Sequence, residues 1–240
     1  MKQLYSLLLL IFIIGCNSPK KGNVTITGNI KGLKKGTIYL QKIQDTVLIN
    51  VDSVIVASGD NAMFTMITSV DEPEIHYLYL DKNDGIIHND RVDFFVEPGE
   101  INITTNVRNF EEDIKIIGGK NETKFQEFKK INKRFNDRNL RLIKDNFEAS
   151  KQNDDEKLIK NDKMYKNLIK QRYLYTINFA LNNKDKEVAP YIILSEVFDA
   201  NIKYLDTVAN SLTPSVKKSL YGKQLVEFIQ KRKKEDPSKK

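Results

Sequence analysis

Cysteine is nearly absent from this 240-residue chain, whose one cysteine is Cys16. A chain with one cysteine forms no internal disulfide. It also cannot carry out dithiol–disulfide exchange, which needs an attacking thiol and a resolving thiol. A lone cysteine in an exported protein needs a reason of its own, and the residues that precede Cys16 supply one.

Long apolar runs are scarce as well, and the clearest of them ends beside Cys16. Met1 and Lys2 give a basic start, residues 7–14 form an apolar run too short for a permanent transmembrane helix, and Gly15 precedes Cys16. This order is typical of a bacterial lipoprotein signal peptide. It predicts cleavage between Gly15 and Cys16 and acylation of Cys16, as by palmitate. An ordinary secretory signal is the alternative.

The residues that follow Cys16 indicate which side of the membrane the protein faces. Residues 17–22 are polar and rich in helix and strand breakers, as in a tether. No acidic cluster follows Cys16, and this absence favours an anchor that faces the periplasm rather than the cell exterior. We therefore expect a lipid-anchored protein of the bacterial cell envelope, on the periplasmic side of the outer membrane.

The net charge of +7 is unevenly distributed. Residues 1–120 have a net charge of −3 and residues 121–240 a net charge of +10, which predicts a boundary near residue 120. Nucleic-acid binding is not expected, because the basic half contains no groove-reading motif and no aromatic–basic stacking array. A solvated helical surface, or a surface close to anionic lipid, explains the lysines better.

Residues 23–119 predict a β domain. Apolar and polar residues alternate along 24–30, and turn residues such as those at 58–61 separate the apolar runs. Eight short strands spaced in this way indicate an antiparallel β-sandwich or an open barrel. The expected strands are 24–30, 37–43, 47–57, 63–68, 75–80, 92–96, 101–106 and 114–117.

Residues 120–234 predict a helical domain. Phe125, Phe128 and Leu142 recur at helical spacing, and residues 165–177 repeat the pattern without Pro or Gly in either run. Two long helices packed as a hairpin are expected, so the fold class is α+β. Shorter helices are expected at 191–198, 202–209, 215–220 and 223–234, before a disordered tail at 235–240.

Several segments, taken in order, resemble one family. They are ITGNIKGL (26–33), VDSV (51–54), FFVEPG (94–99) and IIGGKN (116–121). They are similar to the DUF4369 domain of Bacteroidetes lipoproteins. The helical half is similar to the segment that follows this domain, through APY (189–191) and the stretch 212–222 that ends in Tyr221 and Gly222.

The resemblance also implies a difference in chemistry. In that family the Tyr-Gly segment usually continues into a thioredoxin-like domain of the ResA/TlpA type, and this chain stops about where that domain would begin. The chain has no Cys-x-x-Cys motif, so the redox activity of the family is not transferred to it. What the resemblance implies for this chain is the anchor at Cys16 and the two-part architecture.

No catalytic, cofactor or metal site is predicted. His76 lies in an expected strand, and His88 follows a stretch at 81–85 that lacks the glycine position and closing glutamate of a calcium loop. Ser53 has no nucleophile-elbow sequence around it. Glu97 belongs to a Glu-Pro-Gly turn.

The hypothesis is therefore a non-catalytic binding or interaction module that docks an oxidoreductase or another envelope protein. One alternative is a periplasmic enzyme acting on peptide or glycan, which would need inward carboxylates of raised pKa around Glu97. The other is a relative of a redox protein that has lost its thioredoxin-like domain.

Overall fold

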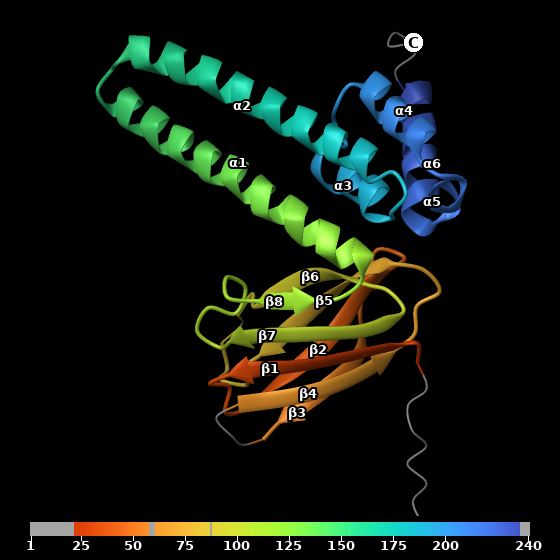
Figure 1. Cartoon of the computed structure of the whole chain (residues 1–240). Helices are drawn as coiled ribbons and strands as arrows, with labels where there is room; N and C mark the ends of the chain where they lie inside the picture. Colours follow the sequence, from red (N-terminus) through yellow and green to blue (C-terminus); the bar gives the residue numbers. More distant parts are fainter. Residues whose placement is uncertain (1–21, 58–60, 87, 236–240) are drawn as a thin grey trace, which may run out of the picture.

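The computed structural model describes residues 22–57, 61–86 and 88–235, in which eight strands are followed by six helices (Figure 1). The predicted signal peptide, the tether up to residue 21 and Cys16 lie outside the described residues. The strands are β1 (Val24–Lys31), β2 (Gly36–Gln44), β3 (Val47–Val56), β4 (Asn61–Thr68), β5 (Glu74–Asp81), β6 (Arg91–Val96), β7 (Gly99–Asn106) and β8 (Lys115–Ile117). The helices are α1 (Lys120–Lys151), α2 (Asp155–Asn182), α3 (Val188–Glu196), α4 (Ile202–Ser211), α5 (Pro214–Lys218) and α6 (Leu220–Glu235).

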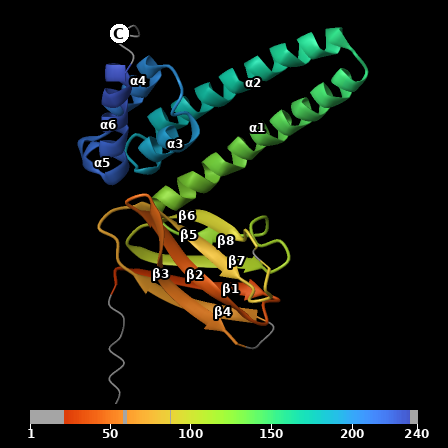
Figure 2. The ribbon, with the colours of Figure 1, turned by 180° about the vertical axis from the view of Figure 1, so that it is seen from behind.

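The strands form two four-stranded sheets, in the orders β4-β1-β7-β8 and β3-β2-β5-β6. The sheets face each other without closing into a barrel, so the α+β prediction is confirmed and the sandwich is the correct one of its two β architectures (Figures 1 and 2). Alternate residues of each strand point into the space between the sheets, as Ile26, Leu40 and Phe94 do, and each of these three is fully buried.

One strand pair departs from the expected antiparallel pattern. β1 and β7 are parallel, with Val24 opposite Gly99. β6 belongs to the other sheet, so the chain changes sheets at Glu97 and Pro98 and enters β7 from the end of the sandwich where β1 begins. Sequence alternation gives the faces of a strand but not its direction, and the parallel pair was therefore not visible in it.

The helical region begins with the predicted hairpin. α1 and α2 run antiparallel and project from the sandwich as one arm (Figures 1 and 2). The helices pack on each other, and Leu142, Ala149 and Leu168 are among their buried residues. A three-residue turn joins them, and the side chain of Asp154 caps α2 by accepting a hydrogen bond from the Lys157 N–H at 3.0 Å.

The four shorter helices pack beside the base of the hairpin (Figure 1). The last helix begins at Leu220, before Gly222, although the glycine predicted a later start. A Cβ on Gly222 would lie 1.9 Å from the carbonyl oxygen of Val216, so this glycine allows close packing and does not end a helix. α6 ends at Glu235, one residue beyond the predicted end.

Within the described residues, no helix combines the length and the apolar character that crossing a bilayer requires. The described chain has two apolar cores. One fills the sandwich, and the other lies among the helices and extends to Ile75 and Phe95 on the outer face of β5 and β6. The second core therefore joins the two halves of the molecule.

Candidate functional site at the sandwich–helix joint

The contact between the end of the sandwich and the start of α1 is called the joint here. At its centre, Gly119 precedes α1 and lies against the side chain of Glu97. The Asn121 N–H points to Glu97 Oε1 at 3.4 Å, so this carboxylate lies at the positive end of the α1 dipole. The turn that changes sheets thus also holds the first turn of the long helix.

The Asn121 side chain extends this contact to a third element. Its Nδ2 donates to Glu97 Oε2 at 2.8 Å and to Glu187 Oε2 at 2.9 Å, while its Oδ1 accepts the Val188 N–H at 2.9 Å. Asn121 is 3 % exposed. One buried amide therefore connects the sandwich, α1 and the first residue of α3, with both its donor and its acceptor satisfied.

An aromatic cluster closes the joint on the apolar side. The Phe95 ring meets Phe125, Tyr191 and Tyr221 edge to face, at centroid distances of 5.5, 5.4 and 6.1 Å. The Tyr221 hydroxyl accepts the Ile75 N–H at 2.8 Å. The APY and Tyr-Gly segments of the helical half thus meet the FFVEPG segment of the sandwich here.

Glu122 is the most unusual ionisable group of the joint, because its side chain is completely buried. Its Oε2 accepts the Phe95 N–H at 2.7 Å, and its Oε1 accepts the Gln126 Nε2–H at 2.6 Å. Burial raises the pKa of the Glu122 carboxyl to about 7, against the two hydrogen bonds and Lys129, which favour the charged form. Both carboxyl oxygens are engaged within the protein.

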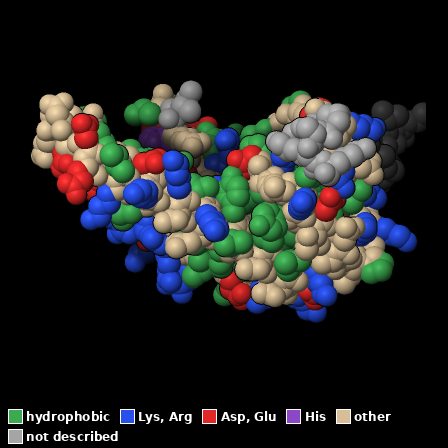
Figure 3. All heavy atoms as spheres, turned by 90° about the horizontal axis from the view of Figure 1, so that it is seen from above, with side chains coloured by type: hydrophobic (Ala, Val, Ile, Leu, Met, Phe, Trp, Pro, Cys, Tyr) green, Lys and Arg blue, Asp and Glu red, His purple; other side chains and the backbone are tan. Residues whose placement is uncertain are grey.

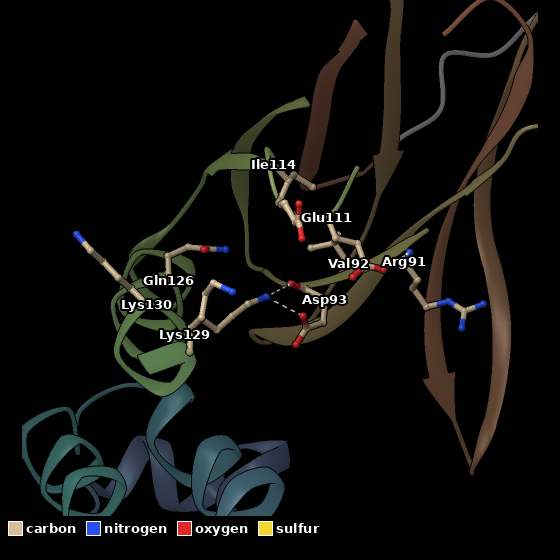
Figure 4. Close-up of a pocket in the computed structure, with 10 residues that line it drawn as sticks. Arg91, Val92, Asp93, Glu111, Ile114, Gln126, Lys129 and Lys130 are labelled. Carbon is tan, nitrogen blue, oxygen red and sulfur yellow. Dashed lines mark hydrogen bonds and ion pairs between the residues drawn. The ribbon is translucent and has the colours of Figure 1, made fainter. Parts of the chain in front are cut away.

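A charged cleft of about 370 Å³ opens beside Glu122, between β6, residues 111–114 and α1 (Figure 4). Lys129 reaches across it from α1 and donates to Asp93 Oδ1 at 2.7 Å and to the Asp93 carbonyl oxygen at 3.0 Å. Basic and acidic side chains both contribute to the walls. The lining residues are Arg91, Val92, Asp93, Glu111, Glu112, Ile114, Gln126, Lys129, Lys130 and Lys133.

The charges of this cleft are partly compensated within the protein. Asp93 already neutralises Lys129. Arg91 turns onto the sheet, where its guanidinium lies 4.9 Å from the Tyr79 ring centroid and its Nε donates to Gln41 at 3.2 Å. Charged groups of both signs, such as Glu112 and Lys133, remain at the rim.

The other residues considered in the sequence lie away from the joint. His76 is 1 % exposed within β5, and burial lowers its pKa to about 4, with Lys42 acting in the same direction. His88 Nε2 lies 2.8 Å from Asp84 Oδ2 in a surface loop. Ser53 is exposed on β3. No three His, Cys, Asp or Glu side chains in the described ranges are placed to hold a metal ion.

The geometry describes a two-part α+β protein whose halves are connected by a buried polar and aromatic joint. Residues 24–125 match the model of the DUF4369 family, a domain of unknown function, so the chain contains a DUF4369 domain. The match covers the sandwich and continues through Asn121 and Glu122 to Phe125. Searches of curated proteins and of solved structures find no match.

Sequence reasoning missed the buried role of Glu122. An acidic residue in the first turn of a helix is common at the surface, where it complements the helix dipole. The position of Glu122 in the sequence therefore does not indicate that it is buried. Asn121 stands in the IIGGKN segment, but its bridge to α3 depends on residues 66 positions further along the chain. The signal that was available is the pair Gly118-Gly119, since consecutive glycines before a helix indicate a close approach.

Replacing Gly119 by alanine should destabilise the protein by about 2 kcal/mol through overpacking. The backbone φ of Gly119 is −75°, which suits any residue, but a Cβ there would lie 1.3 Å from Glu97 Oε1. Urea unfolding measures the loss. Gly118→Ala is the matched control, because its Cβ would meet only ordinary contacts at 3.4 Å. Adding Glu97→Ala should remove most of the Gly119→Ala cost, and equal costs in both backgrounds would contradict this packing account.

The raised pKa of Glu122 predicts a pH-dependent stability term. The pKa of Glu122 is near 7 in the folded chain and near 4.5 in the unfolded chain. Protonation of Glu122 therefore stabilises the folded chain fully below pH 4.5, and this stabilisation is lost as pH rises through 7. Glu122→Gln should therefore become more stable relative to the wild type by about 2.5 kcal/mol between pH 5 and pH 8. Gln126 can turn its amide to receive the new donor.

His76 titrates in the opposite sense, but it does so in both proteins. Comparing the free energy of unfolding of the wild type and Glu122→Gln at each pH therefore isolates the contribution of Glu122. The lowered pKa of His76 makes its contribution fall as pH decreases from 6.5 through about 4. Urea unfolding of the two proteins across this range is the measurement. Glu127→Gln, an exposed position on the same helix, should show no such trend. A difference independent of pH would show that Glu122 titrates normally.

Proposed function

We propose that this protein is a lipid-anchored interaction module of the bacterial cell envelope, without catalytic activity of its own. The observation that carries the proposal is the joint, which fixes the hairpin and the sandwich in one arrangement around the charged cleft. Both halves contribute side chains to that cleft. A partner that binds there meets Asp93 and Glu111 from the sandwich half together with Lys130 and Lys133 from α1.

The polar residues that an enzyme would need at this place are engaged in holding the fold. Glu97 accepts hydrogen bonds from Asn121, and both oxygens of Glu122 receive donors. Glu122 has the raised pKa that a general acid or base needs, but its side chain is fully buried. The arrangement therefore favours binding over hydrolysis of peptide or glycan.

The proposed anchor rests on the sequence of residues 1–16. The apolar run 7–14, the small residue Gly15 and the single Cys16 together favour lipidation. The lack of an acidic cluster after Cys16 favours a periplasm-facing position on the outer membrane. The resemblance of nearly the whole mature chain to the N-terminal part of membrane-tethered thioredoxin-like proteins supports an oxidoreductase as one partner class. It equally supports descent from such a protein after loss of the redox domain.

Replacing Cys16 by serine should release the protein from membranes. The full chain is expressed in a bacterium that processes lipoproteins, and membrane and soluble fractions are compared together with incorporation of an alkyne-labelled palmitate. The wild type and the control Asn17→Ala should remain in the membrane fraction and carry the label. Membrane retention of unlabelled Cys16→Ser would disprove the lipid anchor.

The interaction role is tested by photocrosslinking in living cells. A photoreactive residue at Glu112, exposed at the rim of the cleft, should give one reproducible adduct with another envelope protein. The same residue at Ile55, 76 % exposed on β3, is the control and should not give that adduct. Gly119→Ala should reduce the adduct by displacing α1 from the sandwich. No adduct at Glu112, or one unaffected by Gly119→Ala, would contradict the proposal.

A further inference from the structure

α1 carries an exposed apolar face, in which Lys151 lies over the Phe147 ring with its Nζ 4.2 Å from the ring centroid. Leu140, Ile143 and Phe147 are 64 %, 56 % and 59 % exposed, whereas Leu142 and Ala149 of the same helix are buried against α2. Together with Lys129, Lys133 and Asn136 towards the sandwich, these three residues follow a spacing of alternately three and four. These six positions are called the α1 seam.

The spacing of the seam indicates which kind of secondary structure would pack against it. Residues three and four apart lie on one side of a helix, and a repeat that averages 3.5 residues keeps such a stripe facing a second helix. Lys129 and Lys133 line the charged cleft, so the seam starts in the cleft and continues along the arm. The expected occupant is therefore a helix that lies along α1.

The charges at the two ends of the seam are opposite. Its cleft end has Lys130 and Lys133, beside Lys129, which is paired with Asp93. The hairpin turn beyond its other end has Asp154, Asp155 and Glu156, between Lys151 and Lys157. Figure 3 shows acidic side chains gathered at the end of the hairpin, with Lys and Arg along its length. An antiparallel helix with this same charge order would place acid against base at both ends.

The same chain supplies such a helix. Ile143 lies ten residues after Lys133 and ten before Asn153, so the apolar part of the seam is close to the midpoint between its basic and acidic ends. A two-fold axis near Ile143 would bring the apolar residues of two copies together.

We propose that the α1 seam is the contact surface for a second copy of this chain, in an antiparallel, two-fold symmetric dimer. The acidic turn of each copy lies near Lys130 and Lys133 of the other. Glu111 and Glu112 on the sandwich wall of the cleft repel this acidic turn, which therefore lies against the basic α1 wall. The inference goes beyond the proposed function, because self-association needs neither the lipid anchor nor an outside protein.

The contact is modest in size, since one seam of about 30 Å is buried in each copy. A dissociation constant of about 1–100 µM is therefore expected for the soluble protein. Confinement of both copies to one membrane would raise their effective concentration and favour the pair.

Sedimentation equilibrium of the mature chain with Cys16→Ser, from low to high micromolar concentration, tests the dimer directly. The double variant Leu140→Ser and Phe147→Ser should weaken association about tenfold or more. Ile159→Ser with Leu174→Ser removes exposed apolar residues of α2 and should leave association unchanged. A monomer at every concentration would overturn the proposal, as would a dimer that only the α2 variant weakens.

A charge exchange tests the antiparallel arrangement. Lys130→Glu and Glu156→Lys should each weaken the dimer about threefold to tenfold, because each creates two like-charge contacts. The two changes in one chain should restore association, since the opposite charges meet again with their signs exchanged. Additive weakening in the double variant would exclude this arrangement.

A cysteine at the proposed axis gives a covalent readout. In the Cys16→Ser background the chain has no other cysteine. Ile143→Cys should form a disulfide-linked dimer on mild oxidation, and Ile159→Cys, 60 % exposed on α2, should not. Equal crosslinking at both positions would indicate random collision and count against the seam. The composition of the Glu112 adduct separates the two proposals: a different protein in the adduct supports the proposed function, whereas a second copy of this chain supports the dimer and not the proposed function.

Discussion

The arrangement of the two halves depends on the buried side-chain amide of Asn121. A carboxamide presents two donors and an acceptor in one plane, and here they reach Glu97, Glu187 and the Val188 N–H. Removing the amide would leave two carboxylates near each other and one buried N–H without its partner, a loss much larger than one hydrogen bond. The orientation of the hairpin arm follows from this contact, since α1 starts at the residue before Asn121.

Glu122 adds an electrostatic constraint to the same joint. A buried carboxylate is tolerated because the Phe95 N–H and Gln126 bind both its oxygens, and because Lys129 is near. The Lys129 ammonium bridges to Asp93 on the sandwich. The charged cleft and the buried acid are therefore parts of one network, so a ligand that displaced Lys129 would also change the proton affinity of Glu122.

Sequence patterns predicted the elements better than their contacts. Strand alternation and helical spacing located the eight strands and the hairpin, because burial on one face produces these periods directly. The parallel β1–β7 pair and the bridge from Asn121 to α3 depend on which distant segments meet, and a local pattern does not contain this information. Glu97 was assigned to a turn, which is correct, but its part in holding α1 required the structure. The FFVEPG, IIGGKN, APY and Tyr-Gly segments of the resemblance thus meet at the joint, whereas ITGNIKGL and VDSV lie in β1 and β3 of the sandwich.

Because the polar side chains of the joint bind each other, the proposed recognition of other molecules would use surfaces outside the joint. The α1 seam is such a surface, and it starts in the cleft that both halves build. The joint sets the direction of α1 relative to the sandwich, so it would also determine which chains can lie along the seam. In a two-fold dimer each hairpin turn would reach the cleft of the other copy. Binding of another protein in the cleft would then compete with dimerisation. The relative occupancy of these two states would depend on protein concentration at the membrane.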